Sequence, residues 1–391
     1  MIKKFLNSPG PTPVPAEVLS EMSLPLIHHR TPLFSNIVGE NLELLKYVFR
    51  TEAPVITLTS SGTGAMEASV TNFLSRASRI LVVSAGKFGE RFGEIGRAYG
   101  AEVIEIKAPY GSDIKVDKVE EALKNNPGIE AVYTEYSETS SGVAFDIRGY
   151  AELVRKTGAI LIVDGITAIG AMEFNMDEWG VDVAIAGSQK SFMIPPGLSF
   201  IAVSPKASAK MEKAGMPRFY FDLNREIKSL SKLTTAWTPA ISLFRGLNRA
   251  LKMMKEEGLD NIISRHHDIA DIIRSSVKSI GLELLAGSFG NCVPSDALTA
   301  VKVPEGMDGG KIPGIMRDKY GVTIAGGQDT LKGKIFRLGH LGYVDKSDIL
   351  VLLQATELTL KDLGYKFESG KSVFTAQKMI LEKSASFSQQ K

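Results

Sequence analysis

The sequence has a single cysteine, Cys292, and its net charge is close to zero. One cysteine excludes an internal disulfide framework and a metal site built from several cysteines. No stretch reaches the roughly 18 uninterrupted apolar residues of a membrane-spanning helix, and the start of the chain lacks the apolar segment of a secretion signal. Lys and Arg number 46 against 44 Asp and Glu, a formal charge of +2 that attracts neither nucleic acid nor an anionic membrane. We therefore expect a cytoplasmic protein that binds neither.

Several catalytic and metal-binding motifs are also missing. The pairs His28-His29 and His266-His267 lack the H-E-x-x-H spacing of a zinc helix, and adjacent side chains point apart, so we expect no metal site. Residues 327–334 have the wrong glycine spacing for a P-loop, and Ile335 stands where Ser or Thr would bind magnesium. The absence of a G-x-S-x-G elbow argues against an α/β-hydrolase.

A regular alternation of short apolar runs and helical segments occupies residues 55–188. The chain of 391 residues is long enough for two or three domains. The runs that we expect to be strands are residues 55–59, 79–85, 101–107, 129–136, 159–164 and 181–188. They are too short for buried helices and do not alternate with polar residues, as is typical of strands buried on both faces. This order predicts an α/β protein with a mostly parallel central sheet.

The regions that flank this alternation have a different character. Residues 1–36 contain six prolines and predict an extended arm without strand or helix. The large domain is expected at residues 37–260, ending in long helices. Residues 261–366 mix further strands, including one at 282–286, with helices and predict a smaller C-terminal α+β domain. The tail at residues 367–391 is expected to fray.

Three features follow the carboxyl ends of predicted strands, where open parallel sheets bind their ligands. Small residues begin the helix after the first strand, and its free N–H groups with the hydroxyls of Ser61 and Thr63 suit a phosphate, although ordinary helix capping explains them equally well. Asp164 ends an apolar run, either as a buried partner of a cation or as a loop carboxylate. Lys190 follows another strand, where a lone lysine is ordinarily a solvated surface residue.

All three features lie on the same edge of one predicted sheet, and together they match pyridoxal phosphate. That cofactor needs a helix terminus for its phosphate, an anion for its pyridine nitrogen and an amine for its aldehyde. Asp164 would keep the ring nitrogen protonated. Lys190 would bind the aldehyde covalently and later carry a proton between the substrate Cα and the cofactor C4′. The sequence therefore predicts pyridoxal 5′-phosphate as the cofactor.

Four motifs, in this order and spacing, resemble the class V aminotransferases of fold type I. They are Ser61-Gly62-Thr63-Gly64-Ala65-Met66-Glu67, Glu138-Thr139-Ser140-Ser141-Gly142, Val163-Asp164 and Gly187-Ser188-Gln189-Lys190. The resemblance is closest to the alanine–glyoxylate and serine–pyruvate (serine–glyoxylate) group and extends from Asn7 to Gly339. It implies the fold type I architecture and ping-pong transfer of an amino group from alanine, serine or aspartate to glyoxylate or pyruvate. It also implies a homodimer with shared active sites.

The resemblance assigns cofactor-binding roles to individual residues. Lys190 matches the lysine that binds the cofactor, and Asp164 matches the partner of the pyridine nitrogen. The remaining cofactor positions are Ser61, Gly62 and Thr63 in the phosphate turn, Gln189 at the phosphate, Thr139 near the phenolic oxygen, and Phe88 stacked on the ring. Better-known members have Trp at the position of Phe88.

Substrate and subunit contacts are implied in the same way. Arg337 matches the arginine that holds the substrate α-carboxylate, for which a guanidinium fork is well suited. Backbone around Gly10 resembles the segment that closes over the substrate. Residues 235–239 resemble the segment that reaches the phosphate of the neighbouring subunit, through Thr235 or Thr238.

Two alternatives share the scaffold. The first is a lyase such as a cysteine desulfurase or a kynureninase; a desulfurase needs a nucleophilic cysteine on a mobile loop, and the surroundings of Cys292 do not resemble that loop. The second is a non-catalytic family member that serves as a subunit or binding partner in a complex. Against this second alternative, every expected cofactor position carries a workable residue.

Overall fold

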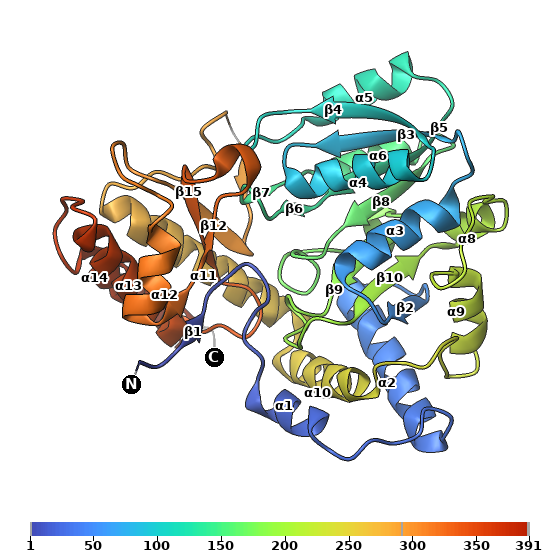
Figure 1. Ribbon diagram of the computed structural model, residues 1–391, viewed down its shortest axis with the longest axis horizontal. Helices are drawn as coiled ribbons and strands as arrows, with labels where there is room; N and C mark the ends of the chain where they lie inside the picture. Colours follow the sequence, from blue (N-terminus) through green and yellow to red (C-terminus); the bar gives the residue numbers. More distant parts are fainter. Residues whose placement is uncertain (1, 291, 389–391) are drawn as a thin grey trace.

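The computed structural model describes residues 2–290 and 292–388, and its largest element is a seven-stranded sheet in the order β2-β10-β9-β8-β5-β3-β4 (Figure 1). The strands are β2 (Val55–Leu58), β3 (Arg79–Ser84), β4 (Glu102–Lys107), β5 (Ile129–Glu135), β8 (Ile160–Asp164), β9 (Val183–Gly187) and β10 (Ser199–Val203). Only β10 runs against the others. The predicted α/β class with a mostly parallel sheet is confirmed.

Helices cover both faces of this sheet. One face packs against α2 (Pro32–Phe49), α5 (Val116–Asn125), α6 (Ile147–Val154), α7 (Met176–Trp179) and α10 (Ile241–Glu257). The other packs against α3 (Gly62–Phe73), α4 (Lys87–Ala98), α8 (Pro205–Met211) and α9 (Leu223–Leu230). In β8, Leu161 and Val163 enter the first core while Ile160 and Ile162 enter the second. The strand is apolar throughout because both of its faces are buried.

The C-terminal part of the chain forms a separate layer beside the large sheet, at the left of Figure 1. Its three-stranded antiparallel sheet has the order β12-β15-β14. Its elements are α11 (Leu259–Ser279), β12 (Leu298–Lys302), α12 (Ile312–Tyr320), β13 (Val322–Thr323), β14 (Ala325–Gly326), the short helix η1 (Asp329–Leu331), β15 (Ile335–Gly339), α13 (Lys346–Asp362) and α14 (Lys371–Ser388). A core of its own holds them together, and the smaller α+β region is as expected. The strand expected at residues 282–286 is absent, and Leu284 makes only an isolated bridge with Val301.

The remaining short strands form two small sheets. The pieces β6 (Ser137–Glu138), β7 (Val143–Ala144) and β11 (Val293–Pro294) form a small sheet, and β1 (Phe5–Leu6) pairs in parallel with β13. This last pairing joins the beginning of the chain to the C-terminal region.

The N-terminal arm is more regular than the sequence predicts. Besides β1 it contains α1 (Ala16–Met22), and α2 begins at Pro32. Pro15 caps α1 and Pro32 lies in the first turn of α2, where the missing N–H of proline has no cost. Val18 of α1 is buried against α10. Burial of this apolar side chain therefore stabilises a helix within a proline-rich segment.

The C-terminal tail also differs from the expectation that it frays. The described part of residues 367–391 contains α14, which packs against α11 and α13; residues 389–391 lie outside the described part. The carboxylate of Glu357 accepts hydrogen bonds from the N–H groups of Gly370 (2.6 Å) and Ser372 (2.8 Å) at the start of α14. These contacts, with the buried Ala376, order the segment.

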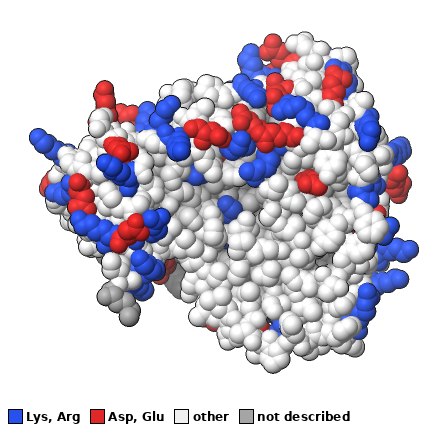
Figure 2. Space-filling model, in the orientation of Figure 1, with Lys and Arg blue, Asp and Glu red and all other residues white. Residues whose placement is uncertain are grey.

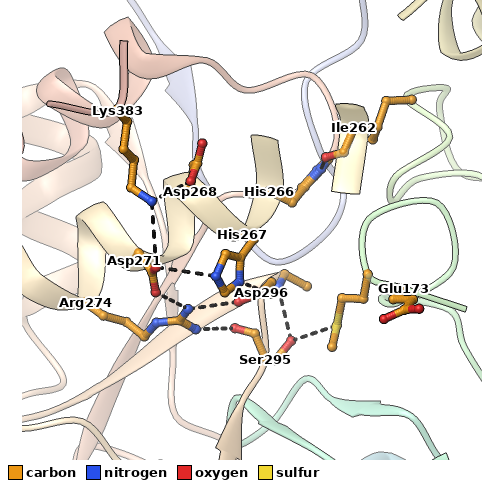
Figure 3. Close-up of polar contacts among 12 residues, drawn as sticks. Glu173, Ile262, His266, His267, Asp268, Asp271, Arg274, Ser295, Asp296 and Lys383 are labelled. Atoms are coloured by element: carbon orange, nitrogen blue, oxygen red, sulfur yellow. Dashed lines mark hydrogen bonds and ion pairs between the residues drawn. The ribbon is translucent and has the colours of Figure 1, made fainter. Parts of the chain in front are cut away.

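A polar network fastens α14 and the segment before β12 to α11 (Figure 3). Arg274 Nη2 lies 2.9 Å from both Asp271 Oδ1 and Asp296 Oδ1, and Lys383 pairs with Asp268. His267 contacts Asp296 (3.0 Å), whereas the adjacent His266 Nδ1 contacts the Ile262 carbonyl (2.7 Å). The two histidines thus have separate partners.

The described residues contain neither a metal-binding cluster nor a membrane-spanning helix. No group of three or more His, Cys, Asp or Glu is arranged to hold a metal ion. No helix in the same residues combines the length and the apolar character needed to cross a bilayer.

Candidate active site

The three strand-end features meet at the carboxyl edge of the large sheet, around the side chain of Ile166. A Cβ on Gly62, at the start of α3, would collide with Ile166, and a Cβ on Gly187, at the end of β9, would lie 3.3 Å from its Cγ2. The backbone N–H of Ile166 donates to Asp164 Oδ1 at 2.7 Å. The phosphate turn, the strand-end acid and the segment that leads to Lys190 are therefore neighbours.

The start of α3 presents unused hydrogen-bond donors. Ser61 is the N-cap residue and its side chain makes no capping bond. Among the described residues, the backbone N–H groups of Gly62 and Thr63 have no acceptor. The hydroxyls of Ser61 and Thr63 are exposed beside them. Together with the positive end of the helix dipole, these donors can bind a phosphate.

Asp164 is a buried carboxylate without a cationic hydrogen-bond partner. It is 3% exposed, and its side chain accepts a hydrogen bond from the Ile166 N–H. Burial is the main cause that raises the pKa of Asp164 from 3.8 to about 6, while the Ile166 N–H and the charge of Lys190 act in the opposite direction. A buried carboxylate without a cationic partner is stabilised when a cationic ring nitrogen approaches it.

Lys190 is buried beneath the N-terminal arm. Lys190 is only 9% exposed, and its Nζ donates a hydrogen bond to the Pro9 carbonyl at 2.7 Å. Burial lowers the pKa of Lys190 from 10.5 to about 8; the charge of Arg337 lowers it further, and Asp164 raises it. An amine with this pKa is neutral in a substantial fraction of molecules near neutral pH, as nucleophilic and proton-transferring lysines must be.

The arm passes directly over this amine because residue 10 is glycine. Gly10 has φ +142°, and a Cβ there would collide with Lys190 Nζ. Thr12 Oγ1 donates to the Lys190 carbonyl at 2.9 Å, and the Gly339 N–H donates to the Asn7 carbonyl at 2.7 Å. The arm is therefore held between Lys190 on one side and the end of β15 on the other.

Arg337, from β15, is held by two carbonyls. Its Nε donates to Gly326 (2.9 Å) and its Nη1 to Thr139 (2.8 Å). Burial lowers the pKa of Arg337 to about 10, so the guanidinium stays charged. Within residues 2–290 and 292–388, Nη2 makes no hydrogen bond. A fixed cation with a free donor can bind a carboxylate.

Thr139 and Phe88 are positioned by a buried acid, Glu138. Its Oε2 accepts from the N–H groups of Phe88 and Gly89, both at 3.1 Å, and its Oε1 accepts from the N–H (2.9 Å) and the hydroxyl (2.6 Å) of Ser140. The start of α4 is thereby fastened to the Glu138–Gly142 turn. Thr139 Oγ1 contacts Thr167 Oγ1 at 3.1 Å.

The partly buried ring of Phe88 has a cation over it. The guanidinium carbon of Arg91 lies 4.8 Å from the ring centroid, and Arg91 Nη1 donates to Thr63 Oγ1 at 3.2 Å. Arg91 therefore links the phosphate turn to the predicted stacking residue.

Among the described residues, no side-chain hydrogen bond joins Thr235 or Thr238 to this group. Thr235 Oγ1 donates to the Trp237 carbonyl at 2.6 Å, and Thr238 is exposed. Both line a small surface pocket beside Thr59, at the end of β2. The structure thus brings together all the predicted site residues except these two.

The residues present fit pyridoxal phosphate chemically. The turn offers free donors for a phosphate, Asp164 offers an anion and Lys190 an amine. In addition, Gln189 can offer its side-chain N–H groups to a phosphate, whereas its Oε1, which only accepts, is buried without a hydrogen-bond partner among the described residues.

The sequence alone did not identify three further residues of the site, Glu135, Glu138 and Arg91. Glu135 lies at the end of an apolar run, Ala131-Val132-Tyr133-Thr134-Glu135, which is the signal that identified Asp164. Glu138 belongs to a motif already recognised, but its role is the three-dimensional fastening of Phe88. No local signal identifies Arg91, because its contacts with Phe88 and Thr63 join residues of α4 and α3.

Comparison with known proteins gives matches over almost the whole chain. The family model described as Aminotransferase class-V matches residues 4–352. The chain is 43% identical over 382 residues to the soluble hydrogenase 42 kDa subunit of Anabaena cylindrica, covering 97% of this chain and 99% of that protein. It is 36% identical over 374 residues to the L-aspartate–glyoxylate aminotransferase of Paracoccus denitrificans, covering 94% of each. Among solved structures, ureidoglycine–glyoxylate aminotransferase from Bacillus subtilis superposes with a TM-score of 0.92 at 26% identity, covering 97% of this chain and 98% of that one.

Proposed function

The chain belongs to the class-V aminotransferase family, whose members are dependent on pyridoxal phosphate, and from this premise we propose that it is a transaminase with fold type I architecture. It would move the amino group of a small amino acid, alanine, serine or aspartate, to a small 2-oxo acid, glyoxylate or pyruvate. The single observation that carries the proposal is the presence of a buried amine, Lys190, and a buried carboxylate, Asp164, at one edge of the sheet. Two half-reactions at one site predict ping-pong kinetics.

Lys190 and Asp164 have complementary roles in this proposal. When bound, pyridoxal phosphate supplies an electron sink for the bonds to the substrate Cα. Lys190 would hold the cofactor through Nζ. Once the substrate amine has displaced Nζ from the cofactor, the freed Nζ would accept and return the Cα proton, for which a pKa of about 8 is well matched. Asp164 provides the negative charge for the ring nitrogen. Both roles depend on burial, because exclusion of water strengthens the interaction between the charges.

The remaining predicted residues hold the cofactor. Ser61, Gly62, Thr63 and Gln189 would bind the phosphate through the free donors at the start of α3 and the Gln189 amide. Phe88 would stack on the ring, with Arg91 beside it, and Thr139 would contact the phenolic oxygen. In each case the required donor or ring is present at the carboxyl edge of the sheet.

Arg337 and the arm around Gly10 would bind the substrate. Nη2 of Arg337 is available for the α-carboxylate, while the Gly326 and Thr139 carbonyls fix the orientation of the guanidinium. The arm covers Lys190 and limits the access of water to its Nζ.

We propose a homodimer in which Thr235 or Thr238 reaches the phosphate of the other subunit. In support, large apolar side chains are exposed around α1 and near α9: Leu19, Leu24, Leu26, Leu33, Phe219, Tyr220 and Leu233. Figure 2 shows few charged side chains over the part of this face where Figure 1 has α1 and α10. Exposed large apolar side chains on a face with few charges are typical of an interface. The arm (1–36), large domain (37–260) and small domain (261–366) remain our proposed division of the chain.

A second candidate function is that of a subunit in a larger assembly. It is favoured by the Anabaena cylindrica relative, which is named as a soluble hydrogenase subunit and is 43% identical to this chain. The lyase alternative has less support: burial raises the pKa of Cys292, and its thiol lies 3.6 Å from Asp113 Oδ1. Both features oppose formation of the reactive thiolate.

A matrix of amino donors and oxo-acid acceptors, measured as separate half-reactions through the absorption spectrum of the bound cofactor, tests the proposal. A transaminase changes its spectrum with a donor alone and recovers it with an acceptor alone. A purified protein that binds no pyridoxal phosphate, or binds it without either spectral change, would instead support the subunit candidate.

A further inference from the structure

A second buried carboxyl lies beside Asp164. Glu135 is the last residue of β5, and in the parallel pairing of β5 with β8 it stands opposite Asp164. The two residues are 2% and 3% exposed, respectively. Each carboxyl group lies close enough to act on the pKa of the other, and Glu135 Oε1 has no hydrogen-bond partner among the described residues. The family roles given above leave Glu135 without a function.

The surroundings decide which of the two carboxyl groups is ionised. Two buried carboxylates in contact cannot both carry a charge, because neither burial nor their mutual repulsion permits it. Asp164 accepts the Ile166 N–H at 2.7 Å and feels the charge of Lys190. Glu135 has only the charge of Arg91 in its favour. Burial, Asp164 and Glu138 together raise the pKa of Glu135 well above its usual range, so Glu135 is the neutral acid.

Three further charged groups act on the pair. Glu138, from β6, raises the pKa of both carboxyl groups; Lys190, after β9, lowers that of Asp164; and Arg91, from α4, lowers that of Glu135. A neutral Glu135 has one O–H to donate, and the acceptor opposite it in the strand pairing is the Asp164 carboxylate. A hydrogen bond to an ionised acceptor stabilises the ionised form.

We propose that Glu135 is a positioning residue for the cofactor: as a neutral acid it donates a hydrogen bond to Asp164 and so keeps Asp164 ionised and oriented toward the ring nitrogen. The inference rests on the proposed function, because it gives Glu135 its role through the pyridoxal phosphate site. It also explains why an acid, and not an apolar residue, ends the buried strand β5. The donor, and not the charge, of residue 135 is what the site uses.

Two substitutions separate the donor from the charge. Glu135→Gln retains a donor, the side-chain amide, without a titratable proton, whereas Glu135→Met fills a similar volume without a donor. Asp182→Asn is the matched control, because Asp182 is a buried acid that contacts the other end of β8 through the Leu161 N–H at 2.9 Å. The readouts are the dissociation constant of pyridoxal phosphate between pH 6 and 9 and the ¹⁵N NMR shift of ring-labelled cofactor, which reports the protonation of its nitrogen.

The expected results follow from the loss of one hydrogen bond to a charged group. In Glu135→Met, the affinity for pyridoxal phosphate at pH 8 falls about ten- to a hundredfold, and the ring nitrogen loses its proton at a lower pH than in the wild type. Glu135→Gln stays within about threefold of the wild-type affinity and keeps the wild-type ¹⁵N shift. Asp182→Asn matches the wild type in both readouts.

Other outcomes overturn the inference. If Glu135→Met matches the wild type in affinity and ¹⁵N shift, or if Glu135→Gln is impaired as much as Glu135→Met, the donor role is wrong while the proposed function stands. If the wild type itself binds no pyridoxal phosphate, the proposed function fails and the role of Glu135 fails with it. Should Glu135→Met not fold, Glu135→Leu is the substitute without a donor.

Discussion

Two buried aspartates contact opposite ends of the same strand, β8, and their surroundings differ. Asp182, at the amino end, accepts from the Leu161 N–H (2.9 Å), the Ser204 hydroxyl (3.2 Å) and Lys206 Nζ (3.2 Å). Asp164, at the carboxyl end, has one backbone donor and a second acid as its neighbour. The first carboxylate is satisfied by the protein itself. The second keeps free capacity for a cation, which distinguishes a ligand site from a structural ion pair.

The two lysines near these aspartates show the same contrast. The Lys206 side chain is 42% exposed and is paired with Asp182. Lys190 is buried, its Nζ hydrogen bond goes to the uncharged Pro9 carbonyl, and burial lowers its pKa to about 8. The charges at the amino end of the sheet therefore stabilise the fold, whereas the buried charges at the carboxyl end destabilise the fold and are available for reaction.

Replacement of the two lysines gives the largest expected difference between the ends of the sheet. Lys190→Ala should abolish the visible absorption of attached cofactor and reduce turnover by at least about a hundredfold, because both the attachment and the proton transfer are lost. Lys206→Ala should retain the absorption and the activity. Absorption spectra and transaminase assays of the two purified variants check this. An active, coloured Lys190→Ala would remove Lys190 from the site.

Replacement of the two aspartates should have opposite effects on function and stability. Asp164→Asn is expected to reduce kcat/KM by about a hundredfold, as removal of a preorganised charge does, and to leave the apoprotein at least as stable at pH 8, because a buried unpaired charge is gone. Asp182→Asn should cost about 1–3 kcal/mol in the free energy of unfolding, because it weakens buried hydrogen bonds, without loss of kcat. Denaturant unfolding and steady-state kinetics measure both quantities. Equal effects of the two substitutions would contradict the comparison.

Arg337→Lys tests the substrate side of the carboxyl edge. Lysine retains the charge but not the planar fork, which the Gly326 and Thr139 carbonyls orient in the wild type. We expect kcat/KM for the amino donor to fall about tenfold or more, mainly through KM, while the affinity for pyridoxal phosphate is retained. Half-reaction kinetics with one amino donor, measured with saturating pyridoxal phosphate, separate the change in KM from any change in cofactor affinity. A change in kcat alone would indicate that Arg337 does not bind the α-carboxylate.

The smallest expected effect concerns the pH at which the cofactor attaches. The neutral amine of Lys190 is required, so the rate of attachment to the apoprotein should rise with pH and level off above about 8, where the pKa lies. A solvated lysine would give a rise that continues toward 10.5. Stopped-flow absorbance between pH 6 and 10 measures this rate. A rate still rising at pH 10 would mean that the amine is not buried in solution.

The same shifts predict how the stability of the apoprotein depends on pH. For Lys190, the folded protein binds fewer protons than the unfolded chain between about pH 8 and 10.5, so its contribution to the free energy of unfolding increases with pH in that window. For Asp164 the folded protein binds more protons between about pH 4 and 6, so its contribution decreases as the pH rises through that window.

The sheet and the central site residues were predictable because their signals are local. Residues 159–164 form an apolar run that ends in an acid, and β8 with Asp164 is that element within one residue. Lys190 and Asp164 were identified as strand-end charges. The position of each predicted strand follows from its own apolar residues, whatever its neighbours in the sheet are.

Features that depend on tertiary contacts were not predictable. Strand β10 was missed: it runs antiparallel between β2 and β9 and is not part of the strand–helix alternation. The ordering of α14 depends on Glu357 of α13, and the turn of α1 depends on burial of Val18. The role of Glu135 depends on its register with Asp164, which no local pattern contains.

The central claim is that the carboxyl edge, and not any other lysine-bearing surface, holds pyridoxal phosphate. Reductive trapping with borohydride, followed by mass spectrometry of the peptides, tests it most directly. The protein is incubated with a stoichiometric amount of pyridoxal phosphate, reduced and digested. We predict that the modified peptide contains Lys190 and that prior addition of an amino donor suppresses the modification. Modification spread over exposed lysines such as Lys206, with Lys190 unmodified, would contradict the account.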